Sequence, residues 1–242
     1  MTAGVSGTAT GDVGTAVVTI VGAALFVVLG ARLTYLALRT RSSVTTTEAA
    51  IWEYFAFAGL VATLYGGLVL TGLWTARTLP FLPGLLLAFA LCFALAMREV
   101  YYNATLANAE VDRLGEFHLR RALEVGFVCL VVVVAIGPML GAGRSGTILG
   151  ALAGVAVVAY GLYFQHRRTK QVATRGTLLD SLVRHSVPVL VFAGAGIVTP
   201  SLALGTTSEQ IARALAAVFV LATATSLLGV AIKLQQHRAA HA

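Results

Sequence analysis

Long apolar stretches alternate with short polar linkers along the whole chain. Each stretch is close to the roughly 20 residues that a helix needs to cross a hydrocarbon core. The stretches are continuous, whereas the strands of a membrane barrel would alternate between apolar and polar residues. Backbone polar groups in lipid must be satisfied internally, so the pattern predicts an all-α bundle of seven transmembrane helices. The seven stretches are Ala16–Leu38, Ile51–Trp74, Phe81–Tyr102, Ala122–Leu140, Thr147–Phe164, Ser181–Leu204 and Ile211–Leu234.

Composition supports one membrane domain that takes up nearly all of the 242 residues. The chain is 58% hydrophobic and 11% charged, whereas soluble domains carry about 25% charged residues. We therefore expect a single seven-helix domain over residues 14–238, with an extracellular tail at 1–13 and a cytoplasmic tail at 239–242. The first tail is rich in Gly, Ser and Thr and lacks the basic start of a signal peptide, so the first helix is expected to act as an uncleaved membrane signal.

The net charge of +7 is distributed unevenly between alternate linkers. With the N-terminus placed outside, 14 of the 17 Lys and Arg residues fall on the cytoplasmic side and three, Arg77, Arg144 and Arg213, fall outside. Cytoplasmic loops of membrane proteins carry such an excess of Lys and Arg. The bias predicts that the N-terminus is outside and that the C-terminus is in the cytoplasm of a multi-pass cell-membrane protein. It also explains the net charge without a nucleic-acid partner.

Ionisable residues inside or beside membrane helices are the candidate functional residues. Most of them fall near the predicted cytoplasmic helix ends. Glu53 and Glu99 are the deepest acids, and each could face an Arg. One interpretation is a polar vestibule for a ligand, a proton relay or a protein partner; the other is helix-end charges that reach the surface and pair. The candidate cluster comprises Arg32, Glu53, Arg98, Glu99, Glu124, Arg184, His185 and Lys233.

No catalytic, cofactor-binding or metal site is predicted. Cys92 and Cys129 lie in apolar stretches and fit small packing residues rather than a disulfide. No Ser/His/Asp arrangement, HExxH, P-loop or GxGxxG is present in a usable context. Hydroxyl groups at mid-membrane depth could line a small cavity or bond to their own backbone. The sequence shows no acid–base pair at the midplane, which a proton pump would be expected to carry.

Small and aromatic residues suggest where the helices pack and where they meet the membrane surface. Gly146, Gly150 and Gly154 are spaced at intervals of four, which allows another backbone to approach closely. This row fits either packing within the bundle or a homo-oligomer. Trp52 and Trp74, both on the second predicted helix, are expected to act as interface anchors.

The chain resembles the microbial rhodopsins in its helix number and its predicted orientation. Tyr160-Gly161-Leu162-Tyr163-Phe164, a basic linker and then Leu182-Val183-Arg184-His185 are similar to that family's passage from the fifth to the sixth helix. Arg77, just before the third predicted helix, lies roughly where that family often has an arginine. The resemblance implies a retinal-binding lysine near Ser226, but the only lysine of that helix is Lys233, about two turns later. We therefore expect no covalent retinal, and no functional residue of the family is carried over.

The leading functional expectation is a non-enzymatic sensor or receptor-like module that signals through its basic cytoplasmic face. Its expected partners are the lipid bilayer and either a cytoplasmic protein or further copies of the chain. The segment Arg98–Arg121, which mixes acidic and basic residues, is expected to be a solvated loop, with an extension of the third helix, a short surface helix or a docking surface for a partner as alternatives. A small transporter or channel is the second function considered, and a membrane enzyme or redox subunit built on the cytoplasmic histidines is the third.

Overall fold

The computed structural model describes residues 6–42, 46–77, 79–106, 113–169, 178–205 and 208–239. This part of the chain is helical, contains no strand, and has seven helices long and apolar enough to cross a membrane. The predicted helix class and the predicted number of helices are therefore confirmed. The elements are α1 (Ser6–Arg41), α2 (Thr46–Thr75), α3 (Leu82–Leu106), α4 (Arg113–Ile136), the 3₁₀ turn η1 (Gly137–Leu140), α5 (Gly143–Thr169), α6 (Leu178–Leu202) and α7 (Glu209–Ala239).

Several helices extend beyond the apolar stretches that identified them. α1 begins at Ser6, inside the predicted tail, although its apolar span starts at Val13. α3 continues to Leu106 and α4 begins at Arg113, so the solvated-loop prediction for Arg98–Arg121 is wrong on both sides of residues 107–112, which lie outside the described residues, and the alternative of an extended third helix is the one observed for residues 98–106. Hydropathy identifies the part of a helix that lies in lipid, and extending an existing helix beyond that part costs little.

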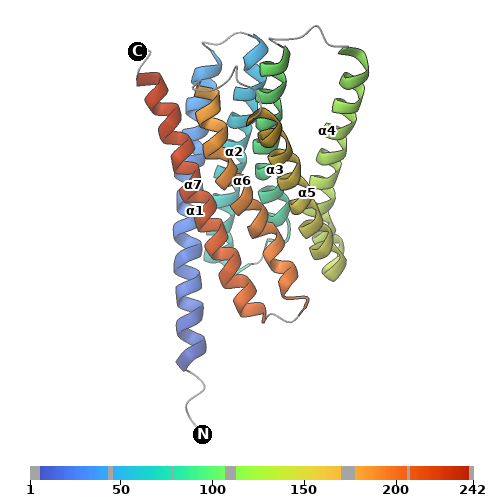
Figure 1. Cartoon of the computed structure of the whole chain (residues 1–242). Coiled ribbons are helices and arrows are strands. Elements are labelled where there is room, and N and C mark those ends of the chain that lie inside the picture. Colours follow the sequence, from blue (N-terminus) through green and yellow to red (C-terminus); the bar gives the residue numbers. More distant parts are fainter. Residues whose placement is uncertain are drawn as a thin grey trace.

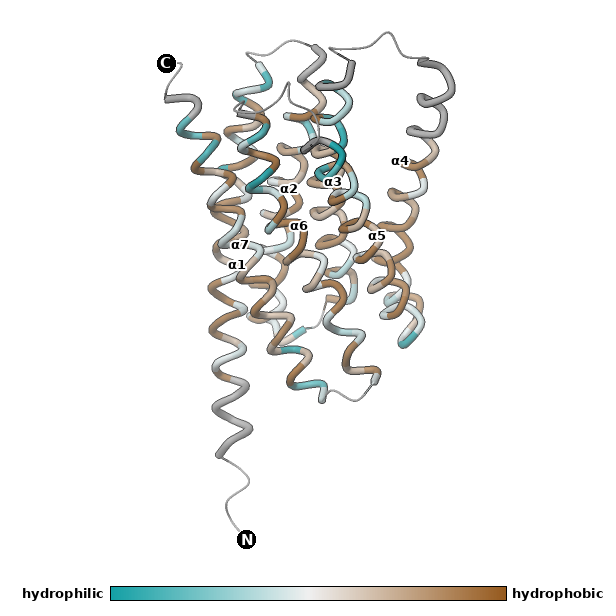
Figure 2. Tube along the Cα trace, viewed as in Figure 1, coloured by the Kyte–Doolittle hydropathy of each residue, from teal (hydrophilic) through white to brown (hydrophobic). Residues whose placement is uncertain are grey.

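The helices form one bundle in which α3 is central and α4 is peripheral (Figure 1). The most extensive seams join α1 to α2, α6 to α7 and α2 to α3, and α7 also packs against α1. In the apolar span of α3, 78% of the residues are buried, against 6% for α4. The middle of each helix is mostly apolar, and hydrophilic residues gather near the helix ends (Figure 2). α4 is therefore the helix that the bundle holds least firmly.

Aromatic side chains fill the interior between α1, α2 and α3. The Phe26 ring lies 5.2 Å from the Tyr65 ring and 5.5 Å from the Phe89 ring, and Phe89 lies 5.0 Å from Phe93. These edge-on contacts are the arrangement that aromatic rings prefer. Phe55 extends the row, with its ring 5.5 Å from that of Phe93. The centre of this half of the bundle is consequently closed by rings.

The two tryptophans of α2 lie in different environments. Trp74 is 92% exposed at one end of the helix, which suits the predicted interface anchor. Trp52 is 2% exposed and packs against Phe55, with ring centroids 6.1 Å apart. The prediction of an interface anchor is therefore wrong for Trp52, because the residue faces into the bundle and extends its aromatic interior.

The backbones of α1 and α2 approach closely at a pair of glycines. A Cβ atom at Gly30 would lie 2.7 Å from the Gly59 carbonyl oxygen, and one at Gly59 would lie 2.6 Å from the Gly30 carbonyl oxygen. Thr34, four residues after Gly30, donates hydrogen bonds to the Gly30 and Ala56 carbonyl oxygens at 3.0 and 3.2 Å. Small residues spaced by four therefore face each other across this seam.

The predicted glycine row of α5 does not form one contact surface. A Cβ atom at Gly154 would lie 3.0 Å from Ile197 of α6, and one at Gly150 would lie 3.6 Å from Val134 of α4. A Cβ atom at Gly146 would meet only Ala142, which precedes its own helix. Two of the three glycines thus pack against different helices within the bundle.

Replacing Gly59 by Ala should destabilise the bundle by about 1–3 kcal/mol, because the added methyl group overpacks the seam. The free energy of unfolding in mixed micelles gives the measurement. Gly67→Ala is the matched control on the same helix, since a Cβ atom there meets nothing within 4 Å. Equal stability of the two variants would show that α1 and α2 do not approach as closely as described.

Candidate functional site

Most of the predicted polar cluster lies at one end of the bundle, here called the basic end. It is the end at which α1, α3, α5 and α7 finish and α2, α4 and α6 begin. The C-terminus of α7 lies at this end, and the start of α1 lies at the opposite end (Figure 1). The basic residues Arg77, Arg144 and Arg213 lie toward the opposite end, in or next to the helix ends there.

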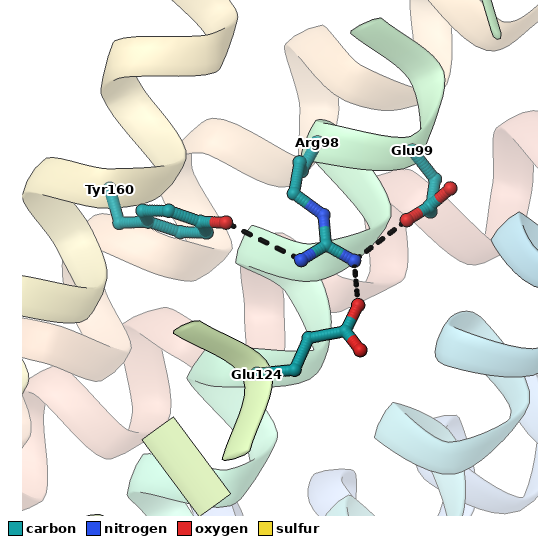
Figure 3. Close-up of polar contacts among 4 residues, drawn as sticks. All are labelled: Arg98, Glu99, Glu124 and Tyr160. Carbon is teal, nitrogen blue, oxygen red and sulfur yellow. Dashed lines mark hydrogen bonds and ion pairs between the residues drawn. The ribbon is translucent and has the colours of Figure 1, made fainter. Parts of the chain in front are cut away.

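The centre of the site is Arg98 of α3, whose side chain is 1% exposed. Its Nη2 atom donates to Glu99 Oε1 at 2.7 Å and also to Glu124 Oε1 of α4. Its Nη1 atom faces the hydroxyl of Tyr160 on α5 at 3.5 Å. Figure 3 shows the guanidinium between these three side chains, so one arginine joins α3, α4 and α5.

The surroundings of Arg98 make this network strongly held. The Glu99 side chain is 5% exposed and that of Glu124 is 31% exposed, so the guanidinium is cut off from solvent on most sides. Tyr160 is itself packed between the rings of Phe127 and Phe164, at 4.9 and 5.0 Å. A buried arginine needs such partners, because an unpaired charge in an apolar environment is costly.

One donor of Arg98 is left without a partner. The Nε atom is buried and makes no hydrogen bond in the described part of the chain. A buried donor without a partner costs free energy, so the hydrogen bonding of Arg98 is incomplete. The network nevertheless links α4 to α3 through Glu124.

The position of Arg98 excludes, for Arg98 and Glu99, the interpretation in which helix-end charges reach the surface. A snorkelling arginine would carry its guanidinium to the surface, but this one is enclosed by α3, α4 and α5. Arg98 is also inside the apolar span Leu82–Asn103, about 7–8 Å of helix rise before its end. It is thus an interior charge near one end of the bundle, away from the midplane.

The other predicted residues form separate pairs. Arg32 donates to Gln235 of α7. Glu53 lies 2.7 Å from Arg41 of α1, and Glu99 lies 2.7 Å from Arg98, so each of the two deep acids faces an Arg as predicted. Three further contacts each stay within a single helix: Arg184 with Asp180 at 3.0 Å and His185 Nδ1 donating to the Ser181 carbonyl at 2.7 Å in α6, and Lys233 donating to Gln236 at 3.2 Å in α7. The eight candidates do not converge on a single vestibule.

The mid-membrane threonines bond to their own helices. Thr63 donates to the Gly59 carbonyl at 2.9 Å, Thr223 to Phe219 at 2.7 Å, and Thr225 to Leu221 at 3.1 Å. Backbone bonding, one of the two predicted roles, is therefore observed for these threonines. Lining of a cavity, the other role, is observed for Thr225 and Ser226, which border a groove of about 390 Å³ beside His185 and Pro188, between α6 and α7.

Within the described residues, no group of three or more His, Cys, Asp and Glu side chains is placed to hold a metal ion. His185 makes its described hydrogen bond within α6, and His166 lies on the exposed side of α5.

Comparisons with protein-family models, with curated proteins and with solved structures found no match for this chain. The resemblance to microbial rhodopsins consequently remains a prediction. What the chain can do has to be argued from its own geometry.

Sequence reasoning identified Arg98, Glu99 and Glu124 but did not connect them to Tyr160. The useful signal was present, because Arg98 and Glu99 interrupt an apolar run in which charges are expensive. Such a charge must find partners on neighbouring helices. Tyr160 is one of the few polar groups at a similar level of α5.

Replacing Arg98 by Met should lower stability by about 3–5 kcal/mol, because two carboxylates then lose their buried partner. The unfolding free energy in mixed micelles is the measurement. Arg184→Met is the control, because its ion pair with Asp180 is largely exposed and should contribute at most about 1 kcal/mol. Equal losses in the two variants would contradict the assignment of Arg98 as a buried link between helices.

Proposed function

We propose that this chain is a non-enzymatic seven-helix membrane sensor that signals from its basic end to a protein partner. Its N-terminus is outside and its C-terminus is in the cytoplasm, following the 14-to-three distribution of Lys and Arg. One observation carries the proposal: the least buried helix, α4, is joined to the bundle through the buried guanidinium of Arg98. The topology is opsin-like, without covalent retinal.

The weak packing of α4 makes it suitable as a moving part. Its exposed apolar side chains include Val125, Val133 and Ile136. Lipid tails solvate such residues as well as a neighbouring helix does, so little free energy opposes an outward displacement of α4. Two contacts therefore set the observed position: the ion pair of Arg98 with Glu124, and the close approach of Gly84 on α3 to Ala135 on α4, where an added Cβ atom would lie 2.6 Å from the Ala135 Cα atom.

A signal needs two arrangements whose free energies differ by only a few kcal/mol. A stimulus that weakens the Arg98–Glu124 contact would release α4, and one that strengthens it would hold the helix. Because α4 begins at Arg113, its displacement would move a basic helix start at the cytoplasmic surface. A partner that reads this surface could distinguish the two arrangements.

The closed interior supports signalling rather than transport. Rings of Phe26, Tyr65, Phe89 and Phe93 occupy the space between α1, α2 and α3. An ion path would need polar groups along the midplane, and the threonines described above bond to their own helices. Glu53, which a vestibule would have used, instead pairs with Arg41 at a half-exposed position.

The proposed orientation predicts which end of the bundle a membrane-impermeant thiol reagent can reach. In a Cys92→Ala, Cys129→Ala background, Ser145→Cys should be labelled in intact cells, because Ser145 is exposed at the opposite end. Ser42→Cys, exposed at the basic end, should be labelled only after permeabilisation. The reverse labelling pattern would show that the bundle is inserted the other way round.

The proposed switch predicts that Glu124→Gln shifts α4, because loss of the carboxylate weakens its link to Arg98. Spin labels at Val125→Cys on α4 and Leu228→Cys on α7, in the same cysteine-free background, would report this as a longer or broader distance distribution in nanodiscs. Glu209→Gln is the control, since it breaks an exposed ion pair at the opposite end.

An unchanged distance distribution in Glu124→Gln would contradict the assignment of this contact as the latch of α4. Flux of ions or small solutes through liposomes that contain the wild-type protein would argue for a channel or transporter instead. A sensor should give no flux above that of empty liposomes, for either the wild type or the Glu124→Gln variant.

A further inference from the structure

A deep apolar groove opens on the side of the bundle between α2 and α4, and α3 forms its floor. Its volume is about 700 Å³, within the range of about 300–1,000 Å³ that is usual for small-molecule sites. The walls are apolar along most of their length, with Phe57 and Val61 on α2, Leu91 and Leu95 on α3 and Val132 on α4.

The groove has the depth of one membrane leaflet. On α2 its lining runs from Ala50 to Val61, which at 1.5 Å per residue is about 16 Å. This is about half of a hydrocarbon core of roughly 30 Å. The groove begins at the basic end and stops near the middle of the bundle, because Ala50 lies in the first turns of α2.

Two opposite charges stand at the mouth of the groove. Arg41 of α1 and Glu53 of α2 both line it, with Arg41 Nη2 2.7 Å from Glu53 Oε1. Their side chains are 49% and 50% exposed, so part of each charged group remains accessible beside the ion pair. A headgroup that carries a negative and a positive charge side by side would complement this pair, whereas a purely anionic one would meet the carboxylate.

We propose that the groove binds one phospholipid whose headgroup combines a phosphate with a primary ammonium, as in phosphatidylethanolamine. The phosphate accepts hydrogen bonds from Arg41, and the ammonium donates to Glu53. An acyl chain of the same leaflet lies along Phe57, Leu91 and Val132. This site goes beyond the signalling proposal and does not rest on it, because the groove, its depth and its charges stand without any movement of α4.

A helix of a partner protein or of a second copy fits the groove less well. Helix–helix seams in membranes are enriched in small residues on the contacting faces. The groove covers only about half of the membrane, and although Ala50, Ala56 and Ala88 line α2 and α3, the α4 face carries Val128, Val131 and Val132.

Native mass spectrometry of the purified full chain tests the site directly. After exchange into detergent with equal amounts of phosphatidylethanolamine, phosphatidylcholine and phosphatidylglycerol, the first should be retained about tenfold more than the others, which corresponds to one charge-assisted hydrogen bond. Glu53→Gln should remove this preference, because it removes the acceptor for the ammonium, whereas Arg41→Gln should lower the retention of all three lipids, because they share the phosphate. Arg39→Gln is the matched control, because Arg39 is exposed on the same turn of α1 and does not line the groove.

A pair of neighbouring α4 variants tests the apolar part of the site. Val132→Trp should fill the groove and abolish lipid retention, whereas Val133→Trp should not, because Val133 is equally exposed but lies outside the groove. Equal retention of all three lipids, a preference for phosphatidylglycerol, or dimers that Val132→Trp abolishes would each overturn the proposal. Failure of the α4 displacement in Glu124→Gln would leave this result unaffected, so the two proposals can fail separately.

Discussion

The absence of water inside a membrane is the constraint on which this structure depends. Every backbone N–H and C=O group must find a partner within its own segment, which makes each crossing a helix. The same constraint acts on side chains, and Thr63 and Thr223 satisfy it by bonding to carbonyl groups of their own helices. It acts most strongly on Arg98, whose guanidinium cannot be both buried and unpaired. The chain meets this demand by bringing Glu124 and Tyr160 from two other helices.

The constraint also explains why α4 differs from the other helices. Burying apolar side chains against another helix is little more favourable than leaving them in lipid, because lipid tails are as apolar as the side chains of the interior. Close backbone contact holds α1 against α2, where Gly30 meets Gly59. α4 has one such close approach near its end, where a Cβ atom at Gly84 of α3 would lie 2.6 Å from the Ala135 Cα atom, and nearer its start the ion pair of Glu124 links it to Arg98. Polar contact thus adds to close packing at the edge of the bundle.

The sequence was sufficient to predict the helices because hydropathy and the demand for internal hydrogen bonds act locally. It could not predict where Ser6 and Arg113 begin their helices, since helix ends outside the lipid leave no apolar signal. The residues of the site could be named from the sequence because burying a charge in an apolar segment costs free energy, so charges such as Arg98 are rare there and stand out. Their grouping could not, because it depends on which faces of α3, α4 and α5 meet. Trp52 shows the limit well, since the same residue type is exposed at one end of α2 at Trp74 and fills the interior at Trp52.

The seam between α1 and α7 has a consequence for how the chain assembles. These are the first and last helices of the sequence, and they pack side by side along the bundle. Chains fold progressively from the N-terminus while they are being synthesised. α1 and α2 can form their close glycine contact early, because few residues separate them, but one flank of α1 must wait in lipid until the last helix is made. The order of synthesis therefore leaves the bundle open beside α1 until α7 has been made, and the seam between α1 and α7 then closes it.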